Sequence, residues 1–271
     1  MRSIRVLGAL LLALWSAPLH ALVLTPIGEA QCASGTTCTV NATGTVPIGG
    51  TIVIYAIIGS KTPANLVVSD NAAVSNCGGA YPAQFIGYGT AAAVVEAHCT
   101  VTSGAIGSGT TCGANGAAQC TFTLSYSGGA NPIMLAAFAA TGNAQTASFY
   151  AGQGTQVSGT WTSGTPVSGS TTNALQWSSE DAVSVIATNG VTATNQVGTF
   201  TGGFTPIAAY ATTASGPSLW IVKQTMTNGT AQLGFTPTNG SAKAFLNASF
   251  MYVNATAIGT LCVRALVGVG C

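Results

Sequence analysis

Apolar and polar residues alternate along several short segments of the chain. Residues 121–126 place Phe122, Leu124 and Tyr126 on one parity and hydroxyl side chains on the other. The same alternation recurs in residues 246–252 and, over a shorter length, in residues 233–235. A period of two is that of a β-strand with one buried face. The pattern therefore predicts half-buried strands.

Three other runs are apolar on both parities: residues 52–58, 133–140 and 182–187. They are short for helices, and most of their bulky residues are β-branched, which favours central strands. Residues 133–140 also contain alanine and methionine, which favour a helix. We expect strands in all three, with a helix as the alternative for 133–140.

Turn signals separate these runs at frequent intervals, among them Gly49-Gly50, Asn189-Gly190 and Asn228-Gly229. Asn-Gly supplies the positive φ angles that tight hairpin turns require. No amphipathic helix of ordinary length is visible, and many short strands with regular turns indicate a sandwich or barrel. The predicted fold class is all-β, a two-sheet antiparallel jelly-roll-like β-sandwich with local disulfides.

The order of these elements resembles a family of bacterial secreted and cell-surface β-sandwich domains of jelly-roll, concanavalin-like type, often repeated in large exported proteins. The resemblance spans about residues 45–253. The segments that carry it are residues 49–55, 68–72, 120–125, 135–142, 174–177, 183–190 and 244–252. It implies a fold and not a reaction, and it brings no catalytic residues with it.

The first 21 residues have the layout of a secretory signal. Arg2 and Arg5 precede an apolar run at residues 6–15, and small residues lead to a predicted cleavage site after Ala21. The run is too short to span about 30 Å of hydrocarbon, and no later segment reaches the roughly 18 apolar residues that a membrane span needs. We therefore expect a signal peptide at 1–21, one β-sandwich domain at 22–253, and a C-terminal tail at 254–271 pinned by a disulfide. The location is secreted, extracellular or at the cell surface.

Charged residues make up only 4% of the chain, against about 25% in typical domains. Without residues 1–21 the chain keeps four cations and five anions, too few to build a basic patch, so we expect no nucleic-acid partner. The mean hydropathy of +0.49 indicates a folded chain. Hydroxyls and amides would cover its surface and repel other copies little. Partners are then glycans or copies of the protein itself, with a well-hydrated monomer as the alternative.

Eight cysteines follow the predicted cleavage site, and an even count in an exported chain indicates disulfides. Eight cysteines allow 105 pairings, although spacing suggests neighbours. These neighbours are Cys32–Cys38, Cys77–Cys99, Cys112–Cys120 and Cys262–Cys271. Zinc is disfavoured, since no C-x2-C occurs and His98 is the one histidine after residue 21. We expect no metal and no cofactor.

Few residues are suited to catalysis. Glu180 and Asp181 are adjacent, so on a strand they would point to opposite faces; we expect them to end the loop before the 182–187 strand. Glu96 and His98 share one parity and could hydrogen-bond, which keeps an extracellular hydrolase as a remote hypothesis. The alternative is a solvent-facing pair beside a disulfide.

Two further groups could bind a ligand. Asp70-Asn71 offers oxygens for calcium, but one carboxylate with one amide is more typical of an Asx turn. Trp161, Trp177 and Trp220 are candidates for stacking on sugar rings, and Trp161, between two threonines, looks the most exposed. A core position between two sheets is the alternative for each.

Together these features predict a non-catalytic exported structural or adhesive β-sandwich protein of the cell surface or extracellular matrix. The alternative is a carbohydrate-binding, lectin-like module that uses surface aromatic residues.

Overall fold

The computed structural model describes most of the chain from Ala21 to Asn254. The described residues are 21–59, 63–71, 80–81, 83–86, 92–101, 120–142, 150–175, 180–190, 194–211, 216–226, 228–238 and 241–254. They form antiparallel strands in four sheets, with one short 3-10 helix, η2, at Thr194–Gln196.

Two sheets come from the N-terminal lobe, residues 21–142. Sheet I contains, in spatial order, β2 (Thr37–Asn41), β8 (Thr121–Ser127), β4 (Ala64–Asp70) and β5 (Ala80–Tyr81). Sheet II contains β1 (Val23–Gly35), β9 (Asn131–Thr141), β3 (Thr51–Ile58), β7 (Ala93–Thr100) and β6 (Ala83–Ile86).

The other two sheets come from the C-terminal lobe, residues 150–254. Sheet III contains β10 (Tyr150–Trp161), β17 (Lys243–Val253), β12 (Glu180–Asn189), β15 (Pro217–Met226) and β14 (Thr205–Tyr210). Sheet IV contains β11 (Val167–Thr171), β16 (Gln232–Pro237) and β13 (Val197–Thr201).

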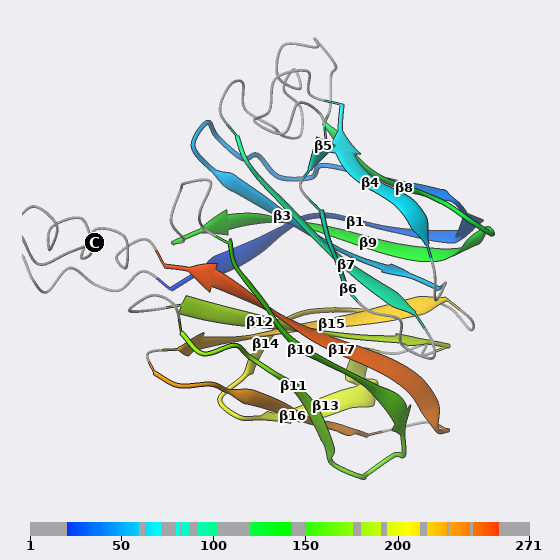
Figure 1. The fold of residues 1–271 in the computed structure, drawn as a ribbon. Coiled ribbons are helices and arrows are strands. Elements are labelled where there is room, and N and C mark those ends of the chain that lie inside the picture. Colours follow the sequence, from blue (N-terminus) through cyan, green and yellow to red (C-terminus); the bar gives the residue numbers. More distant parts are fainter. Residues whose placement is uncertain are drawn as a thin grey trace, which may run out of the picture.

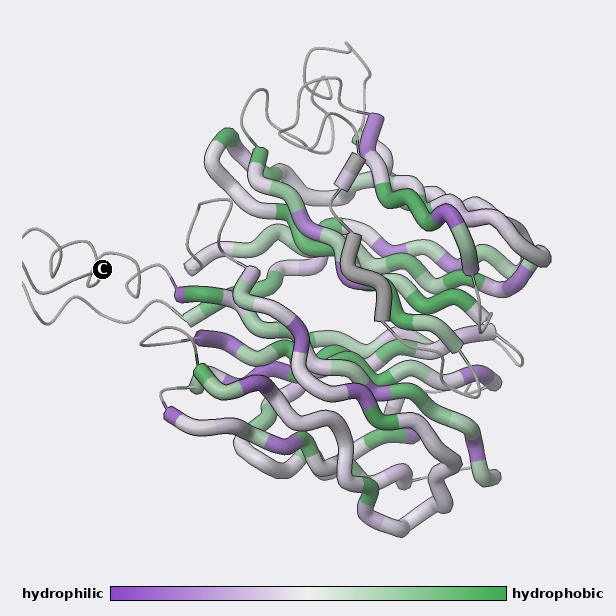
Figure 2. The backbone as a smooth tube through the Cα atoms, in the orientation of Figure 1, coloured by the Kyte–Doolittle hydropathy of each residue, from purple (hydrophilic) through white to green (hydrophobic). Residues whose placement is uncertain are grey.

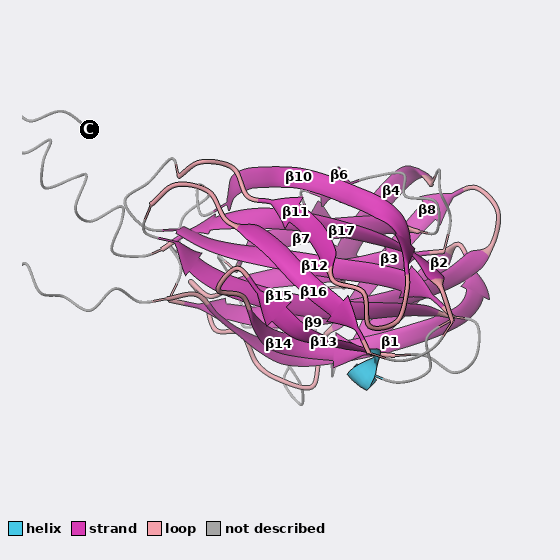
Figure 3. Cartoon of the chain, turned by 90° about the horizontal axis from the view of Figure 1, so that it is seen from below, coloured by secondary structure: helices cyan, strands magenta, loops and turns pink. Residues whose placement is uncertain are grey.

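The four sheets are stacked in the order I, II, III, IV (Figure 1). Viewed from below, the described chain consists almost entirely of strands, with one short helix (Figure 3). Sheets II and III face each other in the middle of the stack, where hydrophobic positions are frequent (Figure 2). Three apolar cores fill the spaces between sheets I and II, II and III, and III and IV.

Strand β3 shows why the middle layers are covered on both faces. All eight of its residues are buried. Ile52, Ile54, Ala56 and Ile58 point into the core shared with sheet I, while Val53, Tyr55 and Ile57 point into the core shared with sheet III. A strand that is apolar on both parities needs a neighbouring layer on each face, because successive side chains point to opposite sides.

Both lobes have the same jelly-roll connectivity. In the N-terminal lobe the order β1-β9-β3-β7 faces β2-β8-β4-β5, and in the C-terminal lobe β10-β17-β12-β15 faces β11-β16-β13. The lobes also meet through equivalent strands. Strand β15 contacts β3 and β9, and its counterpart β7 contacts β12 and β17. Such reciprocal contacts are those of a two-fold interface between similar units.

The predicted all-β, antiparallel class is confirmed, and residues 133–140 form strand β9 rather than a helix. The number of sheets differs from the prediction, because the described residues form four sheets in two sandwiches instead of two in one. A two-sheet sandwich leaves one face of each strand in solvent, whereas the three doubly apolar runs demand cover on both faces. No helix in the described ranges is long and apolar enough to cross a membrane.

Candidate functional site

Two of the three indole rings proposed as sugar platforms, those of Trp161 and Trp220, lie in the core between sheets III and IV. Trp161 is 1% exposed and Trp220 is 2% exposed, so the expectation that Trp161 is exposed is wrong, and the alternative of a core position is confirmed for both. Trp161 stacks on Phe245 with ring centroids 6.1 Å apart, and the Trp220 Nε1 group donates to the Thr194 carbonyl at 2.7 Å. Neither ring offers a face to a ligand. Trp177 lies outside the described residues.

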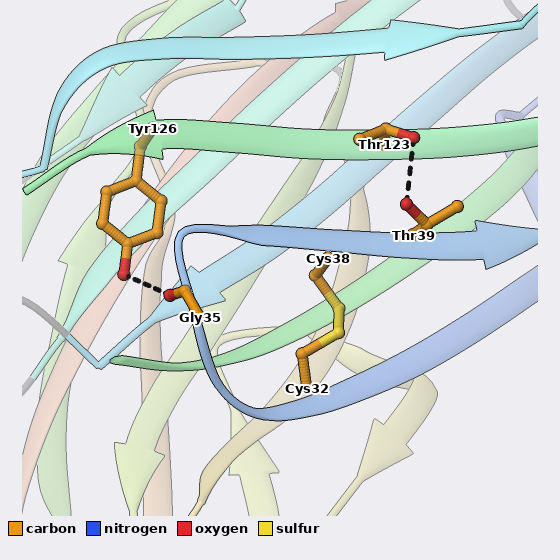
Figure 4. Close-up of a disulfide and its surroundings, with 6 residues drawn as sticks. All are labelled: Cys32, Gly35, Cys38, Thr39, Thr123 and Tyr126. Atoms are coloured by element: carbon orange, nitrogen blue, oxygen red, sulfur yellow. Dashed lines mark hydrogen bonds between the residues drawn. A yellow bond between two sulfur atoms is a disulfide. The ribbon is translucent and has the colours of Figure 1, made fainter. Parts of the chain in front are cut away.

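The cysteines agree with local pairing where the structure describes both partners. Cys32 and Cys38 form a disulfide that joins the end of β1 to β2 (Figure 4). Cys99 and Cys120 are also disulfide-bonded. The cysteines predicted to pair with these two, and the pair predicted for the tail, lie outside the described residues: Cys77, Cys112, Cys262 and Cys271.

A polar cluster lies between the two lobes, centred on Glu96 of β7. The His98 Nδ1 atom is 3.0 Å from Glu96 Oε1, and Tyr252 of β17 donates its hydroxyl to the same oxygen at 3.0 Å. The Tyr55 and Tyr252 hydroxyl oxygens are 2.7 Å apart. Since the Tyr252 proton points to the carboxylate, Tyr55 donates to Tyr252. The predicted hydrogen bond between Glu96 and His98 is confirmed.

The environment of this cluster is that of a protein interior. Glu96 is fully buried and the His98 side chain is 13% exposed, so the expectation of a solvent-facing pair is wrong. The His98 ring stacks on Tyr150 at 4.9 Å. Burial raises the pKa of Tyr55 and Tyr252 well above 10, and the charge of Glu96 raises both further. Both phenols therefore stay protonated, so that Tyr252 donates to the Glu96 carboxylate and Tyr55 donates to Tyr252.

This geometry favours a structural role for the cluster. A carboxylate and an imidazole are present, but they lie between two packed sheets rather than in an open cleft. A buried carboxylate is stable only when hydrogen bonds replace its lost hydration, and Tyr252 and His98 supply them. Catalysis on an external substrate would require access that these side chains lack.

The other predicted acidic sites are structural as well. Glu180 and Asp181 are the first residues of strand β12 and are 1% and 0% exposed, so the prediction that they end a loop is wrong. At the predicted turn, Asp70 closes strand β4 and accepts a hydrogen bond from Tyr81 at 2.8 Å. Asn71 accepts one from the Thr121 amide at 2.9 Å. No group of three metal-binding side chains occurs within the described ranges.

The outer face of sheet I is a regular polar surface. Alternate residues of β8 are buried, as the sequence predicted, and the residues between them carry hydroxyls that point outward. Strand β2 follows the same rule. We call this surface the hydroxyl face. Its members are Thr37, Thr39, Asn41, Asn65, Val67, Ser69, Thr121, Thr123, Ser125 and Ser127.

Strand register aligns these side chains in rows across the sheet. Thr39 pairs with Thr123, which pairs with Ser69, and Thr37 pairs with Ser125 in the next row. The Thr39 and Thr123 hydroxyl oxygens are 3.1 Å apart (Figure 4). Neighbouring strands in a sheet are about 4.8 Å apart. Apart from Val67, which pairs with Ser125, the face is thus an ordered array of short, uncharged hydrogen-bonding groups.

Charge is scarce over the rest of the described surface too. Glu29 is the single charged residue of the described chain that is exposed. Lys223 and Lys243 are half-buried, and the remaining acids are half-buried or fully buried. The exposed large apolar side chains of the described residues are Val23, Ile48 and Val67, and they are not aromatic. A partner would meet hydroxyls and amides rather than ionic groups or rings.

Comparison with known proteins adds little. No protein-family model and no curated protein matches the sequence. One similar solved structure is the N-terminal tandem of CBM22-1 and CBM22-2 domains from Xyn10C of Paenibacillus barcinonensis. The match covers 88% of this chain and 98% of that one, at 10% identity and a TM-score of 0.24. At that TM-score the likeness carries no argument about this chain.

Proposed function

We propose that the protein is an exported, non-catalytic structural or adhesive component of the cell surface or extracellular matrix, which associates with copies of itself through the hydroxyl face. The observation that carries this proposal is the ordered array of hydroxyls and amides on β2, β8 and β4. Each hydrogen bond contributes only about 0.5–1.5 kcal/mol net, so adhesion requires many aligned groups, as this face provides.

The shortage of exposed charge supports association between identical copies. Like-charged surfaces repel each other, and a protein with a net charge near zero associates readily. The hydroxyl face contains no ionisable side chain, and Asp70, at the end of β4, lies on the inward parity with Val68. Two such faces can meet without burying an unpaired charge.

The placement of the acids and the histidine supports a non-catalytic role. Glu96, Glu180 and Asp181 are buried, and Glu96 satisfies its hydrogen bonds inside the protein. Two carboxylates that face one open cleft, which glycoside hydrolysis requires, are not found among the described residues.

Carbohydrate binding is the alternative for the same face, since sugars present the same hydroxyl chemistry. Stacking on Trp161 or Trp220 is no longer available to such a module because both rings are buried. Binding would have to use side chains such as Thr39, Asn41 and Thr123.

A Thr39→Lys variant tests the proposal. Thr39 is exposed midway along β2, an edge strand of sheet I, and lies beside Thr123 of β8, so a lysine there places like charges within the contact when two hydroxyl faces meet. We expect the association constant from sedimentation equilibrium to fall at least tenfold, roughly 1.4 kcal/mol, with an unchanged Tm. Thr160→Lys, at an exposed threonine of β10, is the matched control and should associate like the wild type.

Three outcomes would contradict the proposal. If Thr39→Lys and Thr160→Lys associate equally, the hydroxyl face does not form the contact between copies. A strictly monomeric wild type that binds a glycan array, with binding lost in Thr39→Lys, would establish the carbohydrate alternative. Hydrolysis of an extracellular polymer that is abolished by His98→Ala would overturn the non-catalytic role.

A further inference from the structure

The backbone of Leu22 is held in the interior where the described chain begins. Leu22 is fully buried, immediately before strand β1, and its amide N–H donates to the Asp181 Oδ2 atom of β12. Its carbonyl accepts a hydrogen bond from Lys223 Nζ of β15 at 2.5 Å. The residue before it, Ala21, is partly exposed. The chain therefore goes from a partly exposed residue to a buried polar site within one step.

Asp181 is a desolvated carboxylate with few compensating charges. It is 0% exposed and accepts a hydrogen bond from the Thr225 hydroxyl at 2.5 Å. Lys223 Nζ lies 3.9 Å from its Oδ1 atom, at the edge of ion-pair distance. Burial raises the pKa of Asp181, although the contacts with Thr225, Leu22, Lys223 and Asn254 act in the opposite direction. The site would accommodate a further positive charge near the carboxylate.

The buried nitrogen belongs to the bond that the sequence marks for cleavage. Hydrolysis of the Ala21–Leu22 peptide bond consumes one water. The C–N bond breaks, the water oxygen becomes part of the Ala21 carboxylate of the leader, and both water hydrogens end on the Leu22 nitrogen, which becomes an ammonium group. The atom that now donates one neutral hydrogen bond to Asp181 would then carry a full charge.

We propose that removal of residues 1–21 creates a buried ion pair between the α-ammonium group of Leu22 and Asp181, so that processing of the exported chain stabilises the fold. This inference rests on the export included in the proposed function. Asp181 belongs neither to the hydroxyl face nor to a catalytic site, and the ion pair would give this buried carboxylate a role. It also couples maturation to the start of β12, a central strand of sheet III.

The neighbouring ionisable groups do not replace this charge. In register with Asp181, β15 contributes Thr225 and β17 contributes Tyr252, whose hydroxyl is directed to Glu96. Lys223 is the nearby cation, and its ammonium group binds the Leu22 carbonyl. Glu180 precedes Asp181 on the opposite parity of β12. Tyr252 stays neutral at ordinary pH because burial raises its pKa.

The test compares two forms of the exported protein. One begins at Leu22, and the other keeps His20 and Ala21, so that it retains the Leu22 amide but moves the terminal charge away. Below the unfolded α-amino pKa, about 7.7–8.0, we expect the form that begins at Leu22 to have the higher Tm. Pairing with Asp181 raises the pKa of the α-ammonium group in the folded protein above its unfolded value. The difference in Tm between the two forms should therefore disappear as the pH rises through the folded pKa.

Asp181→Asn, introduced into both forms, should abolish the difference in Tm. If that variant does not fold, the rate at which an amine-acylating reagent modifies the α-amino group serves instead, and it should be at least tenfold slower in the native form that begins at Leu22 than in the urea-unfolded chain.

Equal Tm values for the two forms, rapid acylation, or an exported chain that begins at a residue other than Leu22 would overturn the ion pair. These results would leave the association test untouched, whereas failure of the chain to leave the cytoplasm would contradict the proposed function itself.

Discussion

Among single side chains, Tyr252 and Tyr150 sit beside the same buried carboxylate but differ in their hydrogen bonds. Tyr252 donates to Glu96 and accepts from Tyr55. The Tyr150 hydroxyl is buried and has no hydrogen-bond partner among the described residues. Removing a satisfied donor leaves a buried acceptor unpaired, whereas removing an unpaired hydroxyl relieves a desolvation penalty.

We therefore predict opposite results for two identical substitutions. Tyr252→Phe should lower the free energy of unfolding by about 1–3 kcal/mol, because Glu96 and Tyr55 each lose a partner. Tyr150→Phe should leave it unchanged within about 0.5 kcal/mol or raise it. Urea unfolding followed by circular dichroism measures both values. Equal losses in the two variants would refute the hydrogen-bond assignment.

Residue-level chemistry could be predicted from the sequence only where it is local. The hydrogen bond between Glu96 and His98 follows from their shared parity on one strand. The burial of Glu96 could not be foreseen, because Tyr252 lies 156 residues away and belongs to the other lobe. For the same reason Trp161 appeared exposed between two threonines, although aromatic rings from β15, β16 and β17 enclose it.

Among elements, the strand assignments follow directly from periodicity. The alternation in residues 121–126 predicts β8 with its hydroxyls outward, and the structure places them there. The runs that are apolar on both parities predict central strands; β3 and β12 are buried along nearly all of their length, and β9 is buried over residues 133–138 and at Ala140. A run that is apolar on both parities also needs a packed layer on each face of its strand. That requirement indicates more than two sheets, so the pattern already argued against a single two-sheet sandwich.

Strand β17 shows the limit of such patterns. Its alternating apolar residues suggest one solvent face, yet Asn247 and Ser249 are fully buried. They belong to a polar network with Ser170 and Ser184 in the layer between sheets III and IV. Buried hydroxyls and amides bonded to one another look, in sequence, like exposed ones.

For the whole molecule, the shared core between sheets II and III predicts that the two lobes unfold together. Phe122 is fully buried in the N-terminal lobe, between sheets I and II. All tryptophans after residue 21 lie beyond residue 150, so their fluorescence reports on the C-terminal half. If residues 22–253 form a single domain, as expected, a substitution that destabilises one lobe also lowers the unfolding temperature of the other.

Phe122→Ala should destabilise the protein by about 3–5 kcal/mol through the cavity it creates. If the lobes are coupled, thermal unfolding monitored by tryptophan fluorescence shifts to lower temperature together with the circular dichroism signal. A fluorescence transition that stays at the wild-type temperature would mean that the lobes are independent domains.

The central claim is that an uncharged face of aligned hydroxyls, and not ionic contacts or an active site, determines what this molecule does. Its most direct test is the self-association constant measured by sedimentation equilibrium at about 0.05 M and about 0.5 M salt, over which ionic contacts are strongly screened. We expect association at both concentrations with constants that agree within about twofold. Association that weakens steeply with salt, or a monomer at every protein concentration, would contradict it.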